Sequence, residues 1–301
     1  MSDTSKVVLR TRSLARRFGS VRAVRSVDME ICEGEIYAFL GRNGAGKTTT
    51  LNMLMGILRP DDGAIEFFET SNGKRRASVS NEIKQRIGFV SQEQNFYPWM
   101  TCQQLGNFVG AFFPTWDSGE FQRLCQIFEL PRKRKISALS GGMRVKLALV
   151  LALSHRPDML ILDEPTAGLD PVARRELLDA IVTQAQRSRR TTLFSTHRID
   201  EAEQIAHRIG ILHQGAMSFQ GSLQELTSVV REVVIPRESP RPALPADIQL
   251  LQERVRGEHR QLTLLAAAER WQAPDFPFAE STPLSLEDIF VALTRGGFES
   301  L

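Results

Sequence analysis

Long apolar runs and cysteine are scarce in this chain of 301 residues. No apolar stretch approaches the roughly 18 residues that a membrane-spanning helix needs, and the run LALVLALS at residues 147–154 is too short. Residues 1–13 have no hydrophobic segment of the kind that signal peptides contain. The three cysteines, Cys32, Cys102 and Cys125, are odd in number and share no metal-binding spacing, which indicates free thiols in a reducing compartment. We therefore expect a soluble protein, so that any work at a membrane would need a second chain to span it.

An excess of one charge is also missing. The formal net charge of +3 is too small to indicate nucleic acid as the main partner. The basic runs PRKRK at 131–135 and RSRR at 187–190 are typical of solvated surface turns. With 42% apolar and 24% charged residues, the chain can bury a core, and its length suits one large domain with an appendage or two modest domains.

Strand-like and helix-like patterns alternate over most of the chain. β-like runs occur at 7–14 and 27–40, and the second leads through a glycine loop into a helix predicted at 47–58, which Pro60 would stop. The alternation returns from residue 159 onward. It favours an α/β core with a mainly parallel sheet.

The stretch from about 93 to 155 differs from both of its flanks. The chain has 17 Phe, 2 Tyr and 3 Trp, 22 aromatic residues in all, and ten of them lie between Phe89 and Phe128 in segments of helical period. We interpret this stretch as a helical subdomain inserted into the α/β core. Its aromatic side chains can either form the core of that subdomain or remain on its surface to bind a partner.

The character of the sequence changes after about residue 225. Residues 236–247 are proline-rich and indicate a linker or irregular loop. Residues 248–266 are predicted to form two strands about a turn near Gly257, and residues 284–295 a helix. Ser285 is its expected N-cap, with Asp288 three residues on as a variant of the capping box.

A phosphate-binding loop is the clearest motif. GRNGAGKT, at 41–48, fits the pattern G-x-x-x-x-G-K-[ST], and it has the strand before it and the helix after it that the motif requires. Its backbone N–H groups can wrap phosphate oxygens, its lysine can reach the β- and γ-phosphates, and its threonine can ligate Mg²⁺. The residues assigned to ATP in this loop are Gly41, Asn43, Gly44, Ala45, Gly46, Lys47, Thr48 and Thr49.

A pair of carboxylates ends an apolar strand. In MLILDEP, at 159–165, four apolar residues lead to Asp163 and Glu164, and buried acids of this kind need a cation or a reaction to serve. Asp163 is placed to hold Mg²⁺, directly or through water. Glu164 can act as general base on the attacking water, the alternative being that it caps the following turn.

A second anion-binding motif follows from LSGGM at 139–143. Ser140, Gly141 and Gly142 stand directly before a predicted helix, where small residues and the helix N-terminus suit an anion. The chain therefore carries two phosphate-type motifs, nearly a hundred residues apart.

Together, the phosphate loop, the acid pair and LSGGM resemble the ATP-binding-cassette (ABC) ATPase family over about residues 7–225. The resemblance implies a P-loop NTPase, RecA-like core with an N-terminal antiparallel β region, the helical subdomain inserted at about 93–155, and a small α+β C-terminal extension at 226–301. That extension could pack on its own cassette, stabilise a dimer or regulate it. The resemblance also implies ATP hydrolysis, with ATP and Mg²⁺ as the bound groups.

The resemblance explains the second motif as well. In this family the serine–glycine–glycine motif closes over ATP bound by a second cassette in a head-to-tail dimer. Ser140, Gly141 and Gly142 would thus bind ATP in trans, and Asp170 in AGLDP, at 167–171, would cross the dimer interface. Since the γ-phosphate then holds the dimer together, hydrolysis would release it.

Further matches follow in the order of the family. Phe18 stands where an aromatic ring, usually tyrosine, stacks on adenine, although it could also be a core residue. Gln92 matches the glutamine that contacts Mg²⁺ and the attacking water, and His197 matches the histidine that contacts the γ-phosphate. The implied catalytic set is Glu164, His197, Gln92 and Lys47, and the implied metal ligands are Thr48, Gln92 and Asp163.

One departure concerns the signature itself. Met143 replaces the glutamine that commonly ends it, which removes a polar side chain near the nucleotide, so we expect activity with altered kinetics. Arg42 occupies a variable position of the phosphate loop and changes nothing in the assignment.

The insertion and the tail point to a subfamily. NFYPWMT at 95–101, AFFPTWD at 111–117 and the closing LSLEDIFVALT resemble the bacterial ATPases of two-component, ABC-2-type exporters. The resemblance implies a separate integral membrane permease, and a dimer of this chain with itself or with a paralogous cassette. It places the chain in the cytoplasm, peripheral at the inner face of the cell membrane, with the groove beside Gln92 receiving a short helix of the permease.

Two other functions remain open from sequence. One is a soluble ABC ATPase that transports nothing: translation factors carry two cassettes and repair members carry long coiled coils, neither of which occurs here, which leaves a scaffold or assembly role. The other is a binding or regulatory cassette without turnover, which the presence of both Glu164 and His197 disfavours.

Overall fold

The computed structural model describes residues 6–68, 79–240, 243–273, 275–278 and 280–295. The chain forms two compact units, Met1–Met217 and Ser218–Leu301, so that the second unit starts slightly before the change of composition at about residue 225. The strands and helices that lead up to the second unit are β1 (Val7–Phe18), β2 (Val21–Cys32), β3 (Ile36–Gly41), α1 (Lys47–Leu54), β4 (Asp62–Phe67), α2 (Asn81–Gln85), β5 (Ile87–Val90), α3 (Cys102–Gly110), α4 (Ser118–Ile127), η1 (Ile136–Ala138), α5 (Gly141–Ser154), β6 (Met159–Asp163), α6 (Pro171–Ser188), β7 (Thr191–Thr196), α7 (Ile199–Ile205), β8 (Arg208–His213) and β9 (Ala216–Gly221).

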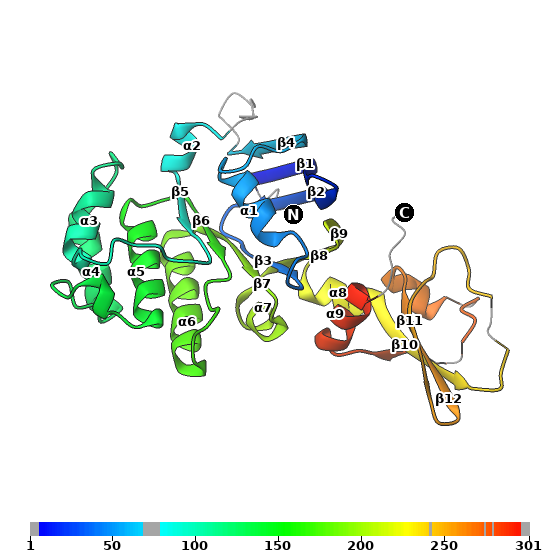
Figure 1. Ribbon diagram of the computed structural model, residues 1–301. Helices are drawn as coiled ribbons and strands as arrows, with labels where there is room; N and C mark the ends of the chain where they lie inside the picture. The colour runs from blue at the N-terminus through cyan, green and yellow to red at the C-terminus, as the bar shows by residue number, and fades with distance from the viewer. Residues whose placement is uncertain (1–5, 69–78, 241–242, 274, 279, 296–301) are drawn as a thin grey trace. The chain divides into compact units, whose positions relative to one another are not determined.

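A nine-stranded sheet organises the first unit, in the order β4-β1-β2-β9-β8-β3-β7-β6-β5. Strands β8, β3, β7, β6 and β5 run parallel to one another, whereas β1 pairs antiparallel with both β2 and β4 (Figure 1). The predicted α/β core with an N-terminal antiparallel region is therefore confirmed.

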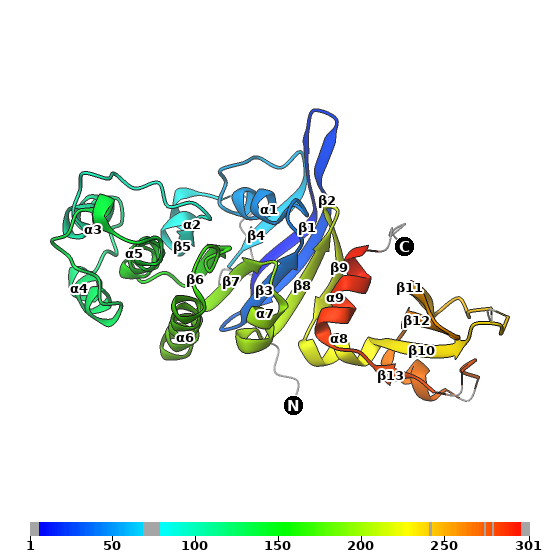
Figure 2. The same ribbon diagram turned by 60° about the horizontal axis from the view of Figure 1, so that its bottom comes forward.

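The parallel strands are buried because helices cover them from both sides. Every residue of β3, β6 and β7 is buried, as expected for strands in the middle of a sheet that has no solvated face. Helix α1 lies on one face of the sheet, and α6 and α7 lie on the other (Figure 2). Since parallel strands end at the same edge, this architecture gathers the loops after β3, β5, β6 and β7.

The predicted helical insertion contains α3, α4 and α5, which lie next to one another beyond the β5 edge of the sheet (Figure 1). Helix α3 begins with a capping box formed by Thr101 and Gln104. Packing between the helices is close at Gly106, where a Cβ atom would lie 2.4 Å from the ring of Phe121. Some of its aromatic side chains are buried in the core of the subdomain, as Phe121 is, and others are exposed, as Trp99 is.

The helix after the phosphate loop is shorter than its sequence pattern predicts. Helix α1 ends at Leu54, not at residue 58. Gly56 has a left-handed backbone with φ of 62°, and the N–H groups of Ile57 and Leu58 both donate to the carbonyl of Asn52. A glycine C-cap thus ends the helix one turn before Pro60 could.

All three cysteines are free thiols, as predicted. Burial raises the pKa of the Cys125 thiol to about 11, and it also raises the pKa values of Cys102 and Cys32. Because the thiolate is the reactive form, none of the three has the character of a nucleophile at neutral pH.

The second unit is built on a four-stranded antiparallel sheet in the order β11-β12-β10-β13. The predicted hairpin is confirmed, with its turn at Gly257, and so is the predicted N-cap, because Ser285 accepts a hydrogen bond from the backbone N–H of Asp288. Its helices and strands are α8 (Leu223–Val229), β10 (Val230–Pro236), β11 (Gln249–Arg256), β12 (His259–Leu265), η2 (Ala268–Gln272), β13 (Thr282–Pro283) and α9 (Leu286–Arg295).

Candidate nucleotide-binding site

The phosphate loop joins β3 to α1 and depends on glycine for its shape. Gly44 and Gly46 have left-handed backbones, with φ of 81° and 109°. At Gly46 a Cβ atom would also lie 2.5 Å from the carbonyl oxygen of Ala23 on β2, so a side chain cannot fit there without movement of that strand. The loop is therefore held tightly against the antiparallel part of the sheet.

The loop lysine points back across the loop. Lys47 is 4% exposed, and its Nζ donates to the carbonyl of Gly41 at 2.7 Å. The same Nζ lies 3.0 Å from Oε1 of Glu164, which follows β6. The lysine charge is thus directed to the edge where the carboxyl ends of β3 and β6 meet.

The acid pair is organised by a serine on the neighbouring strand. Asp163 on β6 is level with Ser195 on β7 in the parallel register. The Ser195 hydroxyl donates to Oδ1 of Asp163 at 2.6 Å and accepts from the backbone N–H of Glu164 at 2.9 Å. Asp163 is therefore buried with a partner, and Glu164 is turned out of the strand with φ of 44°.

Glu164 is held between two predicted catalytic residues. Its Oε1 contacts Lys47, and its Oε2 lies 3.1 Å from Nδ1 of His197, which directly follows β7. The turn after β6 is closed by the backbone instead, through a hydrogen bond from the N–H of Ala167 to the Glu164 carbonyl. The Glu164 side chain therefore faces the phosphate loop and does not cap the turn.

A buried glutamate connects the segments that carry Glu164 and His197, and no sequence motif predicts it. Glu201 on α7 is 1% exposed and accepts hydrogen bonds from the hydroxyls of Thr166 and Thr196, at 2.7 and 2.6 Å. Arg174 and Arg198 lie 3.6 and 3.4 Å from its Oε1. Glu201 thus ties the loop after Glu164 to the strand end before His197.

A cavity of about 230 Å³ opens at this edge of the sheet. It brings Gln92, from the loop after β5, next to the phosphate loop and Glu164. The predicted residues that line it are Asn43, Gly44, Gly46, Lys47, Thr48, Thr49, Gln92 and Glu164.

The oxygen atoms at this cavity fit a magnesium ion bound together with a nucleotide. Thr48 and Gln92, which carry a hydroxyl and an amide oxygen, line the cavity, and Asp163 ends the adjacent strand. Mg²⁺ prefers such oxygen ligands and takes the rest from phosphates and water. In the described part of the chain, no group of three or more His, Cys, Asp or Glu side chains is arranged so that it could hold a metal ion by itself.

Several predicted ATP-binding residues do not line this cavity. Phe18, at the end of β1, is 45% exposed, with the Arg16 guanidinium 4.9 Å from its ring centroid, so it is not a core residue. Ser140 is exposed and caps α5 by accepting from the N–H of Met143 at 3.2 Å. Asp170 is exposed and caps α6, and Gly141 and Gly142 form the first turn of α5.

An apolar groove of about 390 Å³ lies beside the Gln92 loop. Phe96, Val109 and Phe113 line it, and the Phe113 ring stacks on His155 at 4.1 Å. The same subdomain exposes four aromatic side chains, which contact one another at centroid distances of 5.1 to 5.7 Å: Tyr97, Trp99, Phe108 and Phe112.

The fold and the site define an ABC ATPase. The family model described as ABC transporter matches residues 24–167. YxlF of Bacillus subtilis, an uncharacterized ABC transporter ATP-binding protein, is 38% identical over 73% of this chain and 72% of its own length. The Nod factor export ATP-binding protein I of Paraburkholderia xenovorans is 34% identical over 93% of this chain and 94% of its own length.

The chain also resembles a solved structure, the ATP-binding subunit of an ABC transporter. That structure is 27% identical, with a TM-score of 0.64, and the match covers 73% of this chain and 91% of that chain. The chain therefore belongs to the ATP-binding subunits of ABC transporters and is an ATPase. Among the described residues, none of the helices has the length and apolar character needed to cross a lipid bilayer.

Proposed function

We propose that this chain hydrolyses ATP, with Mg²⁺, to power export of a substrate through a separate integral membrane permease. The observation that carries the proposal is the position of Glu164 between Lys47 and His197, at a cavity lined by Gln92. The residues on either side of Gln92 in the chain line the apolar groove. Export as the direction is supported by the likeness to a Nod factor export ATP-binding protein over nearly the whole chain.

In this proposal the residues at the carboxyl edge of the parallel sheet divide the catalytic tasks among them. Glu164 takes a proton from the attacking water, and the Gln92 amide orients that water. Lys47 supplies positive charge to the β- and γ-phosphate oxygens, and His197 holds the second oxygen of Glu164 while it contacts the γ-phosphate. Mg²⁺, held by Thr48 together with Gln92 and Asp163, would neutralise phosphate charge.

The remaining ATP ligands come from a second cassette, either another copy of this chain or a paralogue. Ser140, Gly141 and Asp170 are exposed and lie outside the cavity of their own chain, which supports their use in trans. Gly142, in the same turn, would bring its backbone to the phosphate. Phe18 offers an exposed ring on which adenine can stack.

We further propose that the apolar groove receives a cytoplasmic helix of the permease, which would hold the chain at the inner face of the cell membrane. The groove suits the apolar side of such a helix, because Phe96, Val109 and Phe113 line it. The exposed aromatic cluster adds contact area of the kind that dominates binding energy at interfaces.

Purification from membranes tests this function. The tagged chain should bring an integral membrane protein with it, and Val109→Glu should abolish that association by placing a charge in the groove. Asn107→Glu is the matched control, because Asn107 is exposed on the same helix outside the groove. If the tagged chain without either substitution brings no integral membrane protein with it, the result contradicts the transport function and favours a non-transport ATPase.

A further inference from the structure

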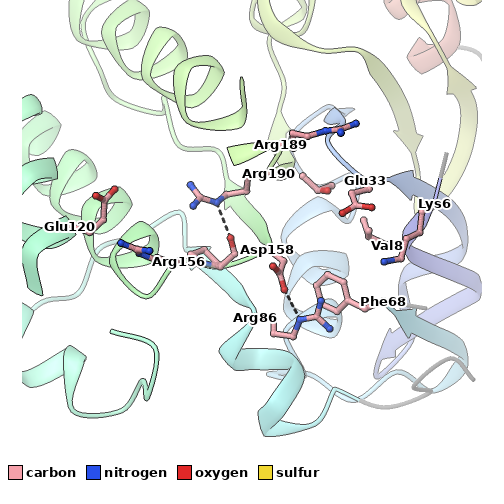
Figure 3. Close-up of a pocket in the computed structure, with 12 residues that line it drawn as sticks. Lys6, Val8, Glu33, Phe68, Arg86, Glu120, Arg156, Asp158, Arg189 and Arg190 are labelled. Carbon is pink, nitrogen blue, oxygen red and sulfur yellow. Dashed lines mark hydrogen bonds and ion pairs between the residues drawn. The ribbon is translucent and has the colours of Figure 1, made fainter. Parts of the chain in front are cut away.

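A second, larger cavity lies at the opposite edge of the parallel sheet. Its volume is about 470 Å³, and it is lined by the residues directly before three adjacent strands: Arg86 before β5, Asp158 before β6 and Arg190 before β7 (Figure 3). The nucleotide cavity is at the carboxyl ends of these strands, so the two cavities are separate sites.

Basic side chains outnumber acidic ones around this cavity. Five cations line it, Lys6, Arg86, Arg156, Arg189 and Arg190, against the three carboxylates of Glu33, Glu120 and Asp158. Two of these carboxylates are already engaged. Asp158 accepts from Nε of Arg86 at 2.5 Å, and Glu120 accepts two hydrogen bonds from Arg123, at 2.7 and 2.6 Å.

Arg190 differs from the other cations of the cavity because it is buried. It is only 7% exposed, and its Nε donates to the carbonyl of Pro157 at 2.9 Å. Its Nη1 is buried without a hydrogen-bond acceptor among the described residues, and no carboxylate there lies within 4.0 Å of its guanidinium. Burial lowers the pKa of Arg190, yet an arginine stays protonated in proteins, so the buried charge persists.

The backbone forces Arg190 into this position. Arg189 ends α6 in a left-handed conformation with φ of 46°, and the N–H of Arg190 donates to the carbonyl of Ala185. This turn sends the Arg190 side chain inward, at the start of β7. Figure 3 shows the Arg190 guanidinium on the same side of the cavity as the Arg156 guanidinium and the Glu120 carboxylate.

Glu120 and Asp158 attract the buried Arg190 charge only at longer range, whereas a phosphate oxygen would give its guanidinium a direct, charge-assisted hydrogen bond. The Arg156 guanidinium can donate to the same phosphate group, because its side chain is 68% exposed and only its Nη2 is engaged, with Asp117. Two planar guanidinium groups facing one space match the oxygens of a phosphate group.

We propose that this cavity binds a small, soluble anion of the phosphate class, such as inorganic phosphate, pyrophosphate or a phosphorylated metabolite. Arg190 and Arg156 donate to it, and Arg189 and Lys6 add positive charge at longer range. This site does not depend on the nucleotide site or on the proposed transport function.

Calorimetric titration of inorganic pyrophosphate into the full chain, without divalent cations, tests the proposal. The wild-type chain should show two binding events, one at the phosphate loop and one here, and Lys47→Gln should remove only the first. In the Lys47→Gln background, Arg190→Gln should weaken the remaining event by about tenfold or more. Arg187→Gln, exposed in the last turn of α6 and outside the cavity, should change it by less than about twofold.

Two further measurements separate loss of the site from loss of the fold. Arg156→Gln alters an exposed side chain and should also weaken the second event. Pyrophosphate should raise the melting temperature of the Lys47→Gln chain but not that of its Arg190→Gln derivative. Unchanged affinity in both arginine variants, or an equal loss in Arg187→Gln, would overturn the proposal.

Discussion

The carboxylate of Glu164 and Nδ1 of His197 lie 3.1 Å apart, at the point where two neighbouring parallel strands end. Glu164→Gln preserves the shape of this pair but removes the group that can accept a proton from water. Hydrolysis should fall by about 10²- to 10⁴-fold, while ATP binding persists. Phosphate release and equilibrium nucleotide binding, measured on the same protein, check both parts.

Gly46 and Gly44 provide a matched pair in the phosphate loop. Gly46→Ala places a Cβ 2.5 Å from the Ala23 carbonyl, whereas Gly44→Ala meets nothing within 4 Å. Both changes strain a left-handed backbone by about 1–2 kcal/mol, so only the steric clash distinguishes them. Nucleotide titrations should show a much larger loss of affinity for Gly46→Ala. Equal losses would mean that contact with Ala23 does not shape the loop.

Glu201 should matter for both stability and turnover. Glu201→Ala leaves Arg174, Arg198 and two hydroxyls without their shared acceptor, and should lower the free energy of unfolding by about 3 kcal/mol. Hydrolysis should also fall, because Thr196 directly precedes His197. Urea denaturation and ATPase assays test this, with the exposed Glu203→Ala on the same helix as the control. A Glu201 variant no less stable than the control would contradict the prediction.

His155 predicts a pH dependence of stability. Its ring is 2% exposed, and burial lowers its pKa from 6.5 to about 4. Folding therefore favours the neutral ring, whose contribution is complete above about pH 6.5 and is lost as the pH falls toward 4. The loss should be about 3 kcal/mol over that range.

His155→Gln, which does not titrate, is the control for this effect. Urea unfolding between pH 7 and 4.5 should show the free energy of the wild type falling more steeply than that of the variant. Parallel curves would rule out His155 as the titrating group.

Contiguous motifs explain how much of this site could be predicted. The phosphate loop, Asp163 and Glu164 adjoin a recognisable strand, so their meeting at one sheet edge follows from parallel topology. Glu201 gives no such signal, because an acid in the first turn of a helix is normally exposed. The burial of Arg190, within a basic run expected at the surface, depends on the turn that ends α6. The sequence pattern extends α1 beyond its true end because the apolar residues continue past Gly56, whose left-handed backbone ends the helix.

In the proposed mechanism, the Ser140 loop of a second cassette completes each ATP site. Light scattering on Glu164→Gln measures this directly. With ATP, the mass should double from the 33.8 kDa of one chain, and Ser140→Arg in the same background should keep it at one chain despite bound ATP. An ATP-loaded Glu164→Gln chain that remains single, or a Ser140→Arg derivative that doubles equally well, would contradict the account.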